Sequence, residues 1–342
     1  GDKIYFTATK DSPLETHLYV TSVSKNGAIE KLTKEPGTHY ITMSADGNHF
    51  VDQYSNLETP NTLQIINATG KVVETLLQSA NPLANHTVGT TTIETLKAAD
   101  GQTDLYARLI KPYNFDANKK YPVIVYVYGG PHSQLVTNSW LAGGDLFLNY
   151  LAQQGYVVWT LDNRGTDNRG FEFQSATHRQ LGTVETADQM KGVNYLKSLP
   201  YVDSTRIGVD GWSFGGFMAI SLKLRYPGVF KVATAGGPVI DWKWYEIMYT
   251  ERYMETPEEN PDGYKTASVL NYVDNLQGKL LLIHGAQDNT VVWQQSLGFI
   301  EECIKKNKQV DYFVYPNHAH NVRGIERMHL YQKLYDYFRE NL

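Results

Sequence analysis

Residues 207–217 read Ile-Gly-Val-Asp-Gly-Trp-Ser-Phe-Gly-Gly-Phe. A short apolar run leads into the pattern Gly-x-Ser-x-Gly, and the helix-forming residues 218–224 follow at once. Strand, sharp turn and helix in this order are typical of a nucleophile elbow, which presents a serine at the end of a buried strand. So tight a turn leaves no room for side chains two positions before and after the serine, where this chain has glycine. The stretch therefore predicts that Ser213 is a nucleophile.

The partners that a nucleophilic serine needs are a base and a carboxylate that orients it. Downstream, the apolar run 279–285 leads to Asp288, and a second strand-like run, 310–315, leads to His318 and His320. Acid followed by histidine, each just past a strand, is the order of an α/β-hydrolase triad. Spacing alone does not decide between the two histidines. His284 lies at a strand end before the acid, so a packing role is expected for it.

Six segments spread over residues 121–342 carry a family resemblance. In this order they resemble the S9 prolyl oligopeptidase family, in its dipeptidyl peptidase IV branch, and are most similar to the bacterial prolyl tripeptidyl peptidases. The segments are 126–131, 162–165, 211–216, 249–253, 284–288 and 315–320.

The resemblance implies roles for several residues around the serine. It places His320, rather than His318, in the catalytic position beside Asp288. It also implies that the Tyr128 hydroxyl and the backbone N–H of Phe214 stabilise the oxyanion. A donor fixed in place before charge develops lowers the barrier by about 3–4 kcal/mol. Without the resemblance, Tyr128 would be one ordinary core tyrosine among 24.

Residues 238–253 are dense in aromatic rings and follow a strand-like run. On a helix, Tyr245 and Tyr249 would share one face, and Trp242 would continue the stripe. A compact box of aromatic faces suits the flat ring of proline. The resemblance implies that the proline pocket is lined by Phe214, Val239, Trp242, Tyr245, Tyr249 and Val291.

Three further positions bear on substrate choice. Glu246 matches an acidic position of the family, and we expect its carboxylate to help bind the amino terminus of the peptide. Thr290 stands where the dipeptidyl branch usually has asparagine, which favours the tripeptidyl relatives. Arg164 represents the arginine of an Asp-Arg-Gly-like family segment, and its role is open.

Composition agrees with a globular enzyme. The chain has 342 residues and a net charge of −5, which indicates no affinity for nucleic acid or membrane surfaces. No apolar run approaches membrane-spanning length. The single cysteine, Cys303, excludes an intrachain disulfide and is expected to be buried in a helix. No Cys/His cluster has metal-ligand spacing, so neither metal nor other cofactor is expected.

The first 85 residues have a different pattern from the rest. Short strand-like runs alternate with turns such as Pro36-Gly37 and Asp46-Gly47, which indicates antiparallel hairpins. These strands are too few to close a β-propeller. We therefore expect residues 1–85 to be the C-terminal fragment of a propeller, and the chain to be a piece of a longer protein. Residues 86–342 are expected to form an α/β-hydrolase domain with a doubly wound, mostly parallel sheet.

The predicted function is that of a serine exopeptidase that cleaves after proline near a free amino terminus, releasing tripeptides or dipeptides through an acyl-enzyme. An acyl-aminoacyl peptidase or an esterase on the same fold is the alternative. A non-catalytic binding protein is a third possibility, which the intact elbow disfavours. The resemblance implies proline-containing peptides as partners, a homodimer or higher homo-oligomer, and a location in the periplasm or at the cell surface. An isolated piece lacking the rest of the propeller is expected to be weak or unselective.

Overall fold

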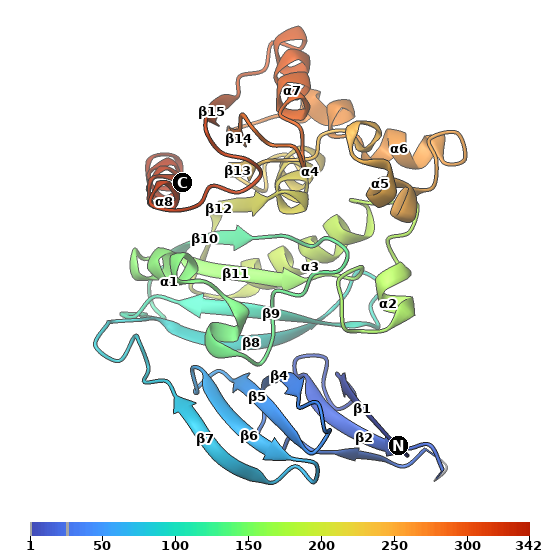
Figure 1. The fold of residues 1–342 in the computed structure, drawn as a ribbon. Helices are drawn as coiled ribbons and strands as arrows, with labels where there is room; N and C mark the ends of the chain where they lie inside the picture. The colour runs from blue at the N-terminus through green and yellow to red at the C-terminus, as the bar shows by residue number, and fades with distance from the viewer. Residues whose placement is uncertain (1, 25–26) are drawn as a thin grey trace.

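The N-terminal part of the chain consists of antiparallel strands. The computed structural model describes residues 2–24 and 27–342. One sheet has the order β1-β2-β3 and a second has the order β4-β5-β6-β7 (Figure 1). The strands are β1 (Lys3–Ala8), β2 (His17–Ser22), β3 (Ile29–Lys31), β4 (Thr38–Met43), β5 (His49–Ser55), β6 (Thr62–Asn67) and β7 (Val72–Gln78). The predicted antiparallel hairpins are thus confirmed, including the turn at Asp46-Gly47 between β4 and β5.

The remainder is built on one large mixed sheet with the order β15-β14-β13-β12-β10-β11-β9-β8. Strands β10 to β15 pair in parallel, whereas β8 and β9 pair antiparallel at one edge. These strands are β8 (Thr90–Lys97), β9 (Asp104–Lys111), β10 (Tyr121–Tyr126), β11 (Val157–Asp162), β12 (Val202–Trp212), β13 (Val232–Gly236), β14 (Lys279–Gly285) and β15 (Asp311–Tyr315). The predicted doubly wound, mostly parallel sheet is confirmed.

Helices cover both faces of this sheet. The α-helices are α1 (Leu146–Gln153), α2 (Phe171–Ser175), α3 (Val184–Ser198), α4 (Phe214–Arg225), α5 (Ile247–Met254), α6 (Pro261–Ala267), α7 (Gln294–Lys305) and α8 (Glu326–Asn341). Three 3₁₀ helices occur among the described residues: η1 (Trp140–Gly143), η2 (Trp242–Trp244) and η3 (Val269–Asn275).

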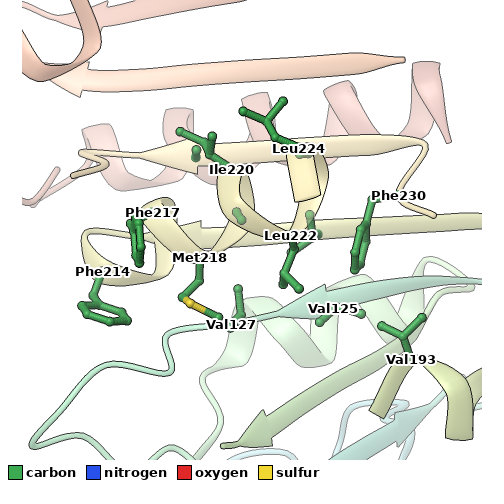
Figure 2. Close-up of a cluster of buried hydrophobic side chains, with 14 of the residues drawn as sticks. Val125, Val127, Val193, Phe214, Phe217, Met218, Ile220, Leu222, Leu224 and Phe230 are labelled. Carbon is green, nitrogen blue, oxygen red and sulfur yellow. The ribbon is translucent and has the colours of Figure 1, made fainter. Parts of the chain in front are cut away.

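The strand period of two divides the core into two layers. Val123, Val125 and Val127 point into one hydrophobic cluster, which also contains side chains of α3, α4 and α7. Ile124 points into the other cluster, against α1 and α8. Figure 2 shows the first cluster, with Met218 of α4 directed toward Val127. The position of Cys303, buried in α7, agrees with its prediction.

This topology determines where a site can form. The order of strands reverses beside β12, and the carboxyl ends of β12, β14 and β15 lie along the same edge of the sheet. Ligands of open α/β sheets bind at such a reversal, outside the carboxyl ends of the strands. Ser213, Asp288 and His320 each follow one of these three strands.

The two parts of the chain meet through the segment around residues 134–140. In Figure 1 the N-terminal sheets lie beside the edge formed by β8 and β9. The domain boundary predicted at residues 85 and 86 falls between β7 and β8 and stays a prediction. Across the two described ranges, no helix is both long enough and apolar enough to cross a bilayer.

Candidate active site

Ser213 occupies the turn between β12 and α4 in a strained backbone conformation. Its φ is 62° and its ψ is −120°, a combination that residues other than glycine rarely adopt. The N–H of Ser213 donates to the Gly236 carbonyl at 2.7 Å, which fixes the turn to the neighbouring strand. A Cβ on Gly211 would collide with the Gly215 carbonyl, and one on Gly215 with the Val127 carbonyl. The glycines of the motif are therefore required by close backbone contacts.

The structure pairs His320, and not His318, with Asp288. Nδ1 of His320 lies 2.7 Å from Oδ2 of Asp288. The ring of His318 instead packs edge-on against Tyr315, with ring centroids 5.8 Å apart. The indole Nε1 of Trp212, one residue before the serine, donates to the His320 carbonyl at 2.9 Å. The elbow thus holds the histidine loop in place.

Asp288 is held as a buried anion by surrounding donors. The N–H groups of Thr290 and Val291 both donate to its Oδ1 at 2.9 Å. Nε2 of His284 lies 3.3 Å from its Oδ2. Burial opposes ionisation, but hydrogen bonds to His284 and His320 outweigh burial and hold the pKa of Asp288 well below its usual range. The carboxylate stays charged and orients His320.

His284 has more contacts than the expected packing role suggested. It is fully buried near the end of β14. Its Nδ1 lies 2.8 Å from Oγ of Ser296, and its Nε2 lies 2.7 Å from the Val291 carbonyl. It therefore supports both Asp288 and the loop that carries Asp288. The only signal in the sequence was its place, four residues before the acid.

The two predicted oxyanion donors lie beside the elbow. Tyr128 follows β10, and its ring centroid is 6.1 Å from that of Phe214. Burial raises the pKa of Tyr128, so its hydroxyl keeps the proton that it would donate. Phe214 is the first residue of α4, where the backbone N–H has no partner from a preceding turn. The buried amide of Asn163 donates to the Gly129 carbonyl at 2.9 Å and so anchors the backbone next to Tyr128.

The predicted aromatic residues do pack together, although one part of the prediction was wrong. Tyr245 is not on a helix: it has extended backbone between η2 and α5, which begins at Ile247. The rings still pack together. The centroids of the stacked Trp242 and Tyr249 rings are 6.0 Å apart, and those of the Tyr245 and Tyr249 rings are 5.3 Å apart. Phe214 lies 5.5 Å from Trp242. Val239 and Val291 are buried in the same hydrophobic cluster.

A cavity of about 490 Å³ opens at the elbow. Its lining includes Ser213, His320, Tyr128, Tyr245 and Thr290. The structure thus brings together the predicted nucleophile, the predicted base, one predicted oxyanion donor and one of the predicted pocket rings. The remaining predicted pocket residues do not line this cavity and belong to the hydrophobic cluster around α4 or pack against it.

Glu246 and Arg164 do not line the cavity at the elbow. Glu246 is exposed and precedes α5 without capping it through its side chain. Arg164 pairs with Asp188 of α3 at 2.9 Å and with Asp100 at 3.1 Å. It therefore ties the turn between β8 and β9 to α3, which is a structural role. In residues 2–24 and 27–342, no three His, Cys, Asp or Glu side chains gather in a way that could hold a metal ion.

Comparisons with known proteins agree with this geometry. Residues 145–342 match the model of the prolyl oligopeptidase family. Residues 1–61 match the model of the dipeptidyl peptidase IV N-terminal region. Dipeptidyl peptidase 8 of Mus musculus is 36% identical over 354 residues, covering 99% of this chain and 39% of that protein. A probable dipeptidyl-aminopeptidase B of Arthroderma gypseum is 34% identical over 97% of this chain and 36% of its own length.

Two solved structures resemble the whole chain. The dipeptidyl peptidase 4 of Porphyromonas gingivalis has a TM-score of 0.93 and 33% identity, covering 99% of this chain and 48% of its own. A protein described as a dipeptidyl aminopeptidase IV from Bacteroides ovatus has a TM-score of 0.88 and 42% identity, covering 100% of this chain and 57% of its own. The chain thus spans about two fifths of the length of the curated relatives that it matches. It belongs to the prolyl oligopeptidase family, in the dipeptidyl peptidase IV branch.

Proposed function

We propose that this chain carries the catalytic centre of a serine peptidase that removes dipeptides or tripeptides ending in proline from the amino terminus of peptides. Ser213 Oγ attacks the carbonyl carbon of the proline residue while His320 takes its proton. The C–N bond then breaks, and His320 gives the proton to the leaving amine. Water, activated by the same histidine, hydrolyses the acyl-enzyme and releases the short peptide.

The observation that best supports this proposal is the pairing of His320 with Asp288 on the cavity that Ser213 also lines. A buried carboxylate fixes the tautomer of the imidazole and stabilises the imidazolium that forms during attack. The hydroxyl of Tyr128 and the N–H of Phe214 would receive the negative charge of the tetrahedral intermediate.

The substrate class rests on the aromatic rings and on the relatives. The half-buried rings of Tyr245 and Tyr249, which pack around the buried Trp242, offer flat apolar faces for a pyrrolidine ring. The relatives named as dipeptidyl peptidases favour release of dipeptides. Thr290, which lines the cavity, supports the tripeptidyl alternative, and the exposed Glu246 would bind the peptide's ammonium group.

Peptides of defined length test this function. The full-length protein is incubated with Gly-Pro-Xaa and Ala-Ala-Pro-Xaa peptides, each free and N-acetylated, and the products are read by mass spectrometry. Release of Gly-Pro from the free peptide alone establishes a dipeptidyl peptidase, whereas release of Ala-Ala-Pro establishes the tripeptidyl activity. Equal cleavage of acetylated peptides would contradict recognition of the amino terminus. Turnover of p-nitrophenyl esters without any peptide cleavage would favour an esterase.

The two histidines of the same loop supply a matched pair of variants. We expect Ser213→Ala and His320→Ala each to lower kcat by about 10⁴-fold or more. His318→Ala is expected to stay within about threefold of the parent, because its ring contacts Tyr315 and not Asp288. The opposite ranking of the two histidine variants would overturn the assignment.

A further inference from the structure

The cavity beside Ser213 extends well past the catalytic residues. After His320 its lining continues along Asn321 and Val322, and it reaches Tyr331 in α8. On the other side it includes Asp210, in β12, and Asp145, which precedes α1. None of these residues was assigned a function above.

The chemistry of the proposed reaction identifies which part of a peptide would enter this space. The histidine gives its proton to the leaving amine, so the leaving chain has to pass His320. The residues that follow His320 in sequence line the cavity, whereas Trp242 and Tyr249 of the aromatic cluster do not. The part of the cavity that is lined by residues 320–322 therefore lies on the leaving-group side of the scissile bond.

Two carboxylates line this space at different depths. Asp210 is only 7% exposed, and its Oδ1 accepts a hydrogen bond from the Thr234 hydroxyl. Asp145 is exposed at the start of α1, where its Oδ1 accepts from the Leu148 N–H at 3.1 Å. Its Oδ2 accepts from the Tyr331 hydroxyl at 3.3 Å.

The negative charge of the pair acts on its neighbours. Burial, together with repulsion by Asp145, raises the pKa of Asp210 to about 6 in spite of the hydrogen bond from Thr234. Burial and then the fields of Asp210 and Asp145 raise the pKa of Tyr126, which lines the same cavity. A cation placed between the two carboxylates would lower the pKa of Asp210 and that of Tyr126.

One basic side chain, Arg327, also lines the cavity. Its Nε donates to the Val322 carbonyl at 3.0 Å. Within the described ranges it forms no ion pair shorter than 4.0 Å with either carboxylate. Among the side chains that line the cavity, two carboxylates therefore outnumber the single guanidinium group, while the buried guanidinium of Arg108, which interacts with Asp145, lies outside the lining.

We propose that this cavity is a leaving-group subsite that selects peptides with lysine or arginine shortly after the scissile bond. This inference rests on the proposed peptidase function and adds a preference on the side opposite the proline pocket. The ammonium or guanidinium group would bind between Asp210 and Asp145. The aliphatic stem would lie against Phe147 and Leu330, which also line the cavity.

The test compares substrates that differ at one position. Gly-Pro-Ala-Xaa-Ala and Gly-Pro-Xaa-Ala-Ala peptides carry lysine, norleucine or glutamate at Xaa, and kcat/KM is measured with the full-length protein. Norleucine has a similar stem without the ammonium group. We expect lysine to exceed norleucine by about tenfold in at least one series, because hydrogen bonds between charged groups are stronger than neutral ones.

Variants locate the source of this preference. Asp210→Asn keeps an acceptor for Thr234, and Asp145→Asn keeps a good cap for α1. Each is expected to reduce the ratio of lysine to norleucine to about threefold or less, and the double variant to abolish it. Both substrates are measured with the same preparation of each variant. Unfolded protein then lowers both rates equally and leaves the ratio of lysine to norleucine unchanged. Glu301→Gln, on the exposed surface of α7, is the control and should leave the ratio unchanged.

Three results would overturn the proposal. They are equal kcat/KM for lysine and norleucine in both series, a preference for glutamate through Arg327, or a lysine preference that survives in the double variant. Gly-Pro-p-nitroanilide separates this failure from a failure of the proposed function, because its leaving group carries no side chain. Hydrolysis of the anilide without a lysine preference refutes the subsite alone. If neither these Gly-Pro substrates nor their Ala-Ala-Pro counterparts are cleaved, both proposals fail.

Discussion

At the scale of single residues, the order of the chain was enough to predict the nucleophile and the acid and to narrow the base to two histidines, but not to predict their supports. Ser213, Asp288 and the loop that carries His318 and His320 each follow a strand, so local patterns identified these positions. The choice between His318 and His320 came from a family resemblance, since spacing left it open. The contacts of His284 with Ser296 and of Trp212 with the His320 carbonyl join residues that only the tertiary structure brings together.

The hydroxyl of Tyr128 allows a direct test of the oxyanion hypothesis. Tyr128→Phe keeps the ring that packs against Phe214 and removes only the donor. We expect kcat on a prolyl anilide to fall about 10²- to 10³-fold, with KM changed by less than about threefold, since the bond forms mainly in the transition state. Tyr113→Phe, at a half-exposed position, is the matched control. A kcat for Tyr128→Phe equal to that of the control would remove Tyr128 from the mechanism.

The buried carboxyl of Glu185 makes stability depend on pH. Burial raises its pKa from 4.5 to about 8, although the Gly182 N–H donates to its Oε2 at 2.9 Å. Between pH 4.5 and 8 the folded state therefore binds more protons than the unfolded state, and stability falls as pH rises. This group alone lowers the free energy of unfolding by up to about 1.4 kcal/mol per pH unit.

Glu185→Gln removes that titration. We expect its free energy of unfolding, relative to the parent, to rise steadily between pH 5 and pH 8. Urea denaturation at each pH measures this difference, and Glu301→Gln, which is exposed, serves as the control. Parallel curves for Glu185→Gln and the parent would mean that Glu185 ionises normally in the folded protein.

At the scale of elements, the strands of the large sheet were predictable, whereas the ring-rich segment was only partly so. Apolar runs bounded by turns identified β12, β14 and β15, because strands that are covered on both faces are largely apolar. Trp242, Tyr245 and Tyr249 were expected to share one face of a helix. In the structure, the carboxylate of Asp241 accepts from the Lys243 N–H and from the distant Ser268 hydroxyl, which stabilises a short 3₁₀ turn. That second contact is tertiary, so sequence periodicity could not reveal it.

The contact of α4 with β10 leads to a prediction about the elbow. Gly215→Ala would place a Cβ against the Val127 carbonyl and the Cα of Tyr128, and backbone atoms cannot move aside cheaply. We expect a loss of about 2–4 kcal/mol in stability and a kcat lowered more than 100-fold, since the oxyanion donor would shift. Ser221→Ala lies in the same helix and removes a buried hydroxyl that has no partner among the described residues. It should be neutral or stabilising in thermal unfolding, and similar behaviour of the two variants would contradict this account.

At the scale of the whole molecule, turn spacing predicted antiparallel strands before the hydrolase, but their attachment could not be predicted. Asn138 makes several of the hydrogen bonds between the N-terminal sheets and the hydrolase. Its N–H donates to the Leu14 carbonyl at 2.7 Å, and its Nδ2 donates to Glu15 Oε1 at 2.7 Å. Its Oδ1 accepts from the Leu57 N–H at 3.3 Å. These partners lie 81 to 124 residues away in sequence, a separation at which local patterns carry no information.

Asn138→Ala therefore tests whether the two parts open as one unit. The substitution removes both side-chain hydrogen bonds and leaves Glu15 paired with His17 alone. Net hydrogen-bond contributions of about 1 kcal/mol each predict exchange about 5- to 30-fold faster for amides of β4 and β5, with the rates in β10 to β14 unchanged. Hydrogen exchange with mass spectrometry measures this, and Asn118→Ala, in an exposed turn, is the control. Faster exchange throughout the large sheet would show instead that the N-terminal strands and the hydrolase unfold cooperatively, so that Asn138 stabilises the whole molecule and not a hinge between its parts.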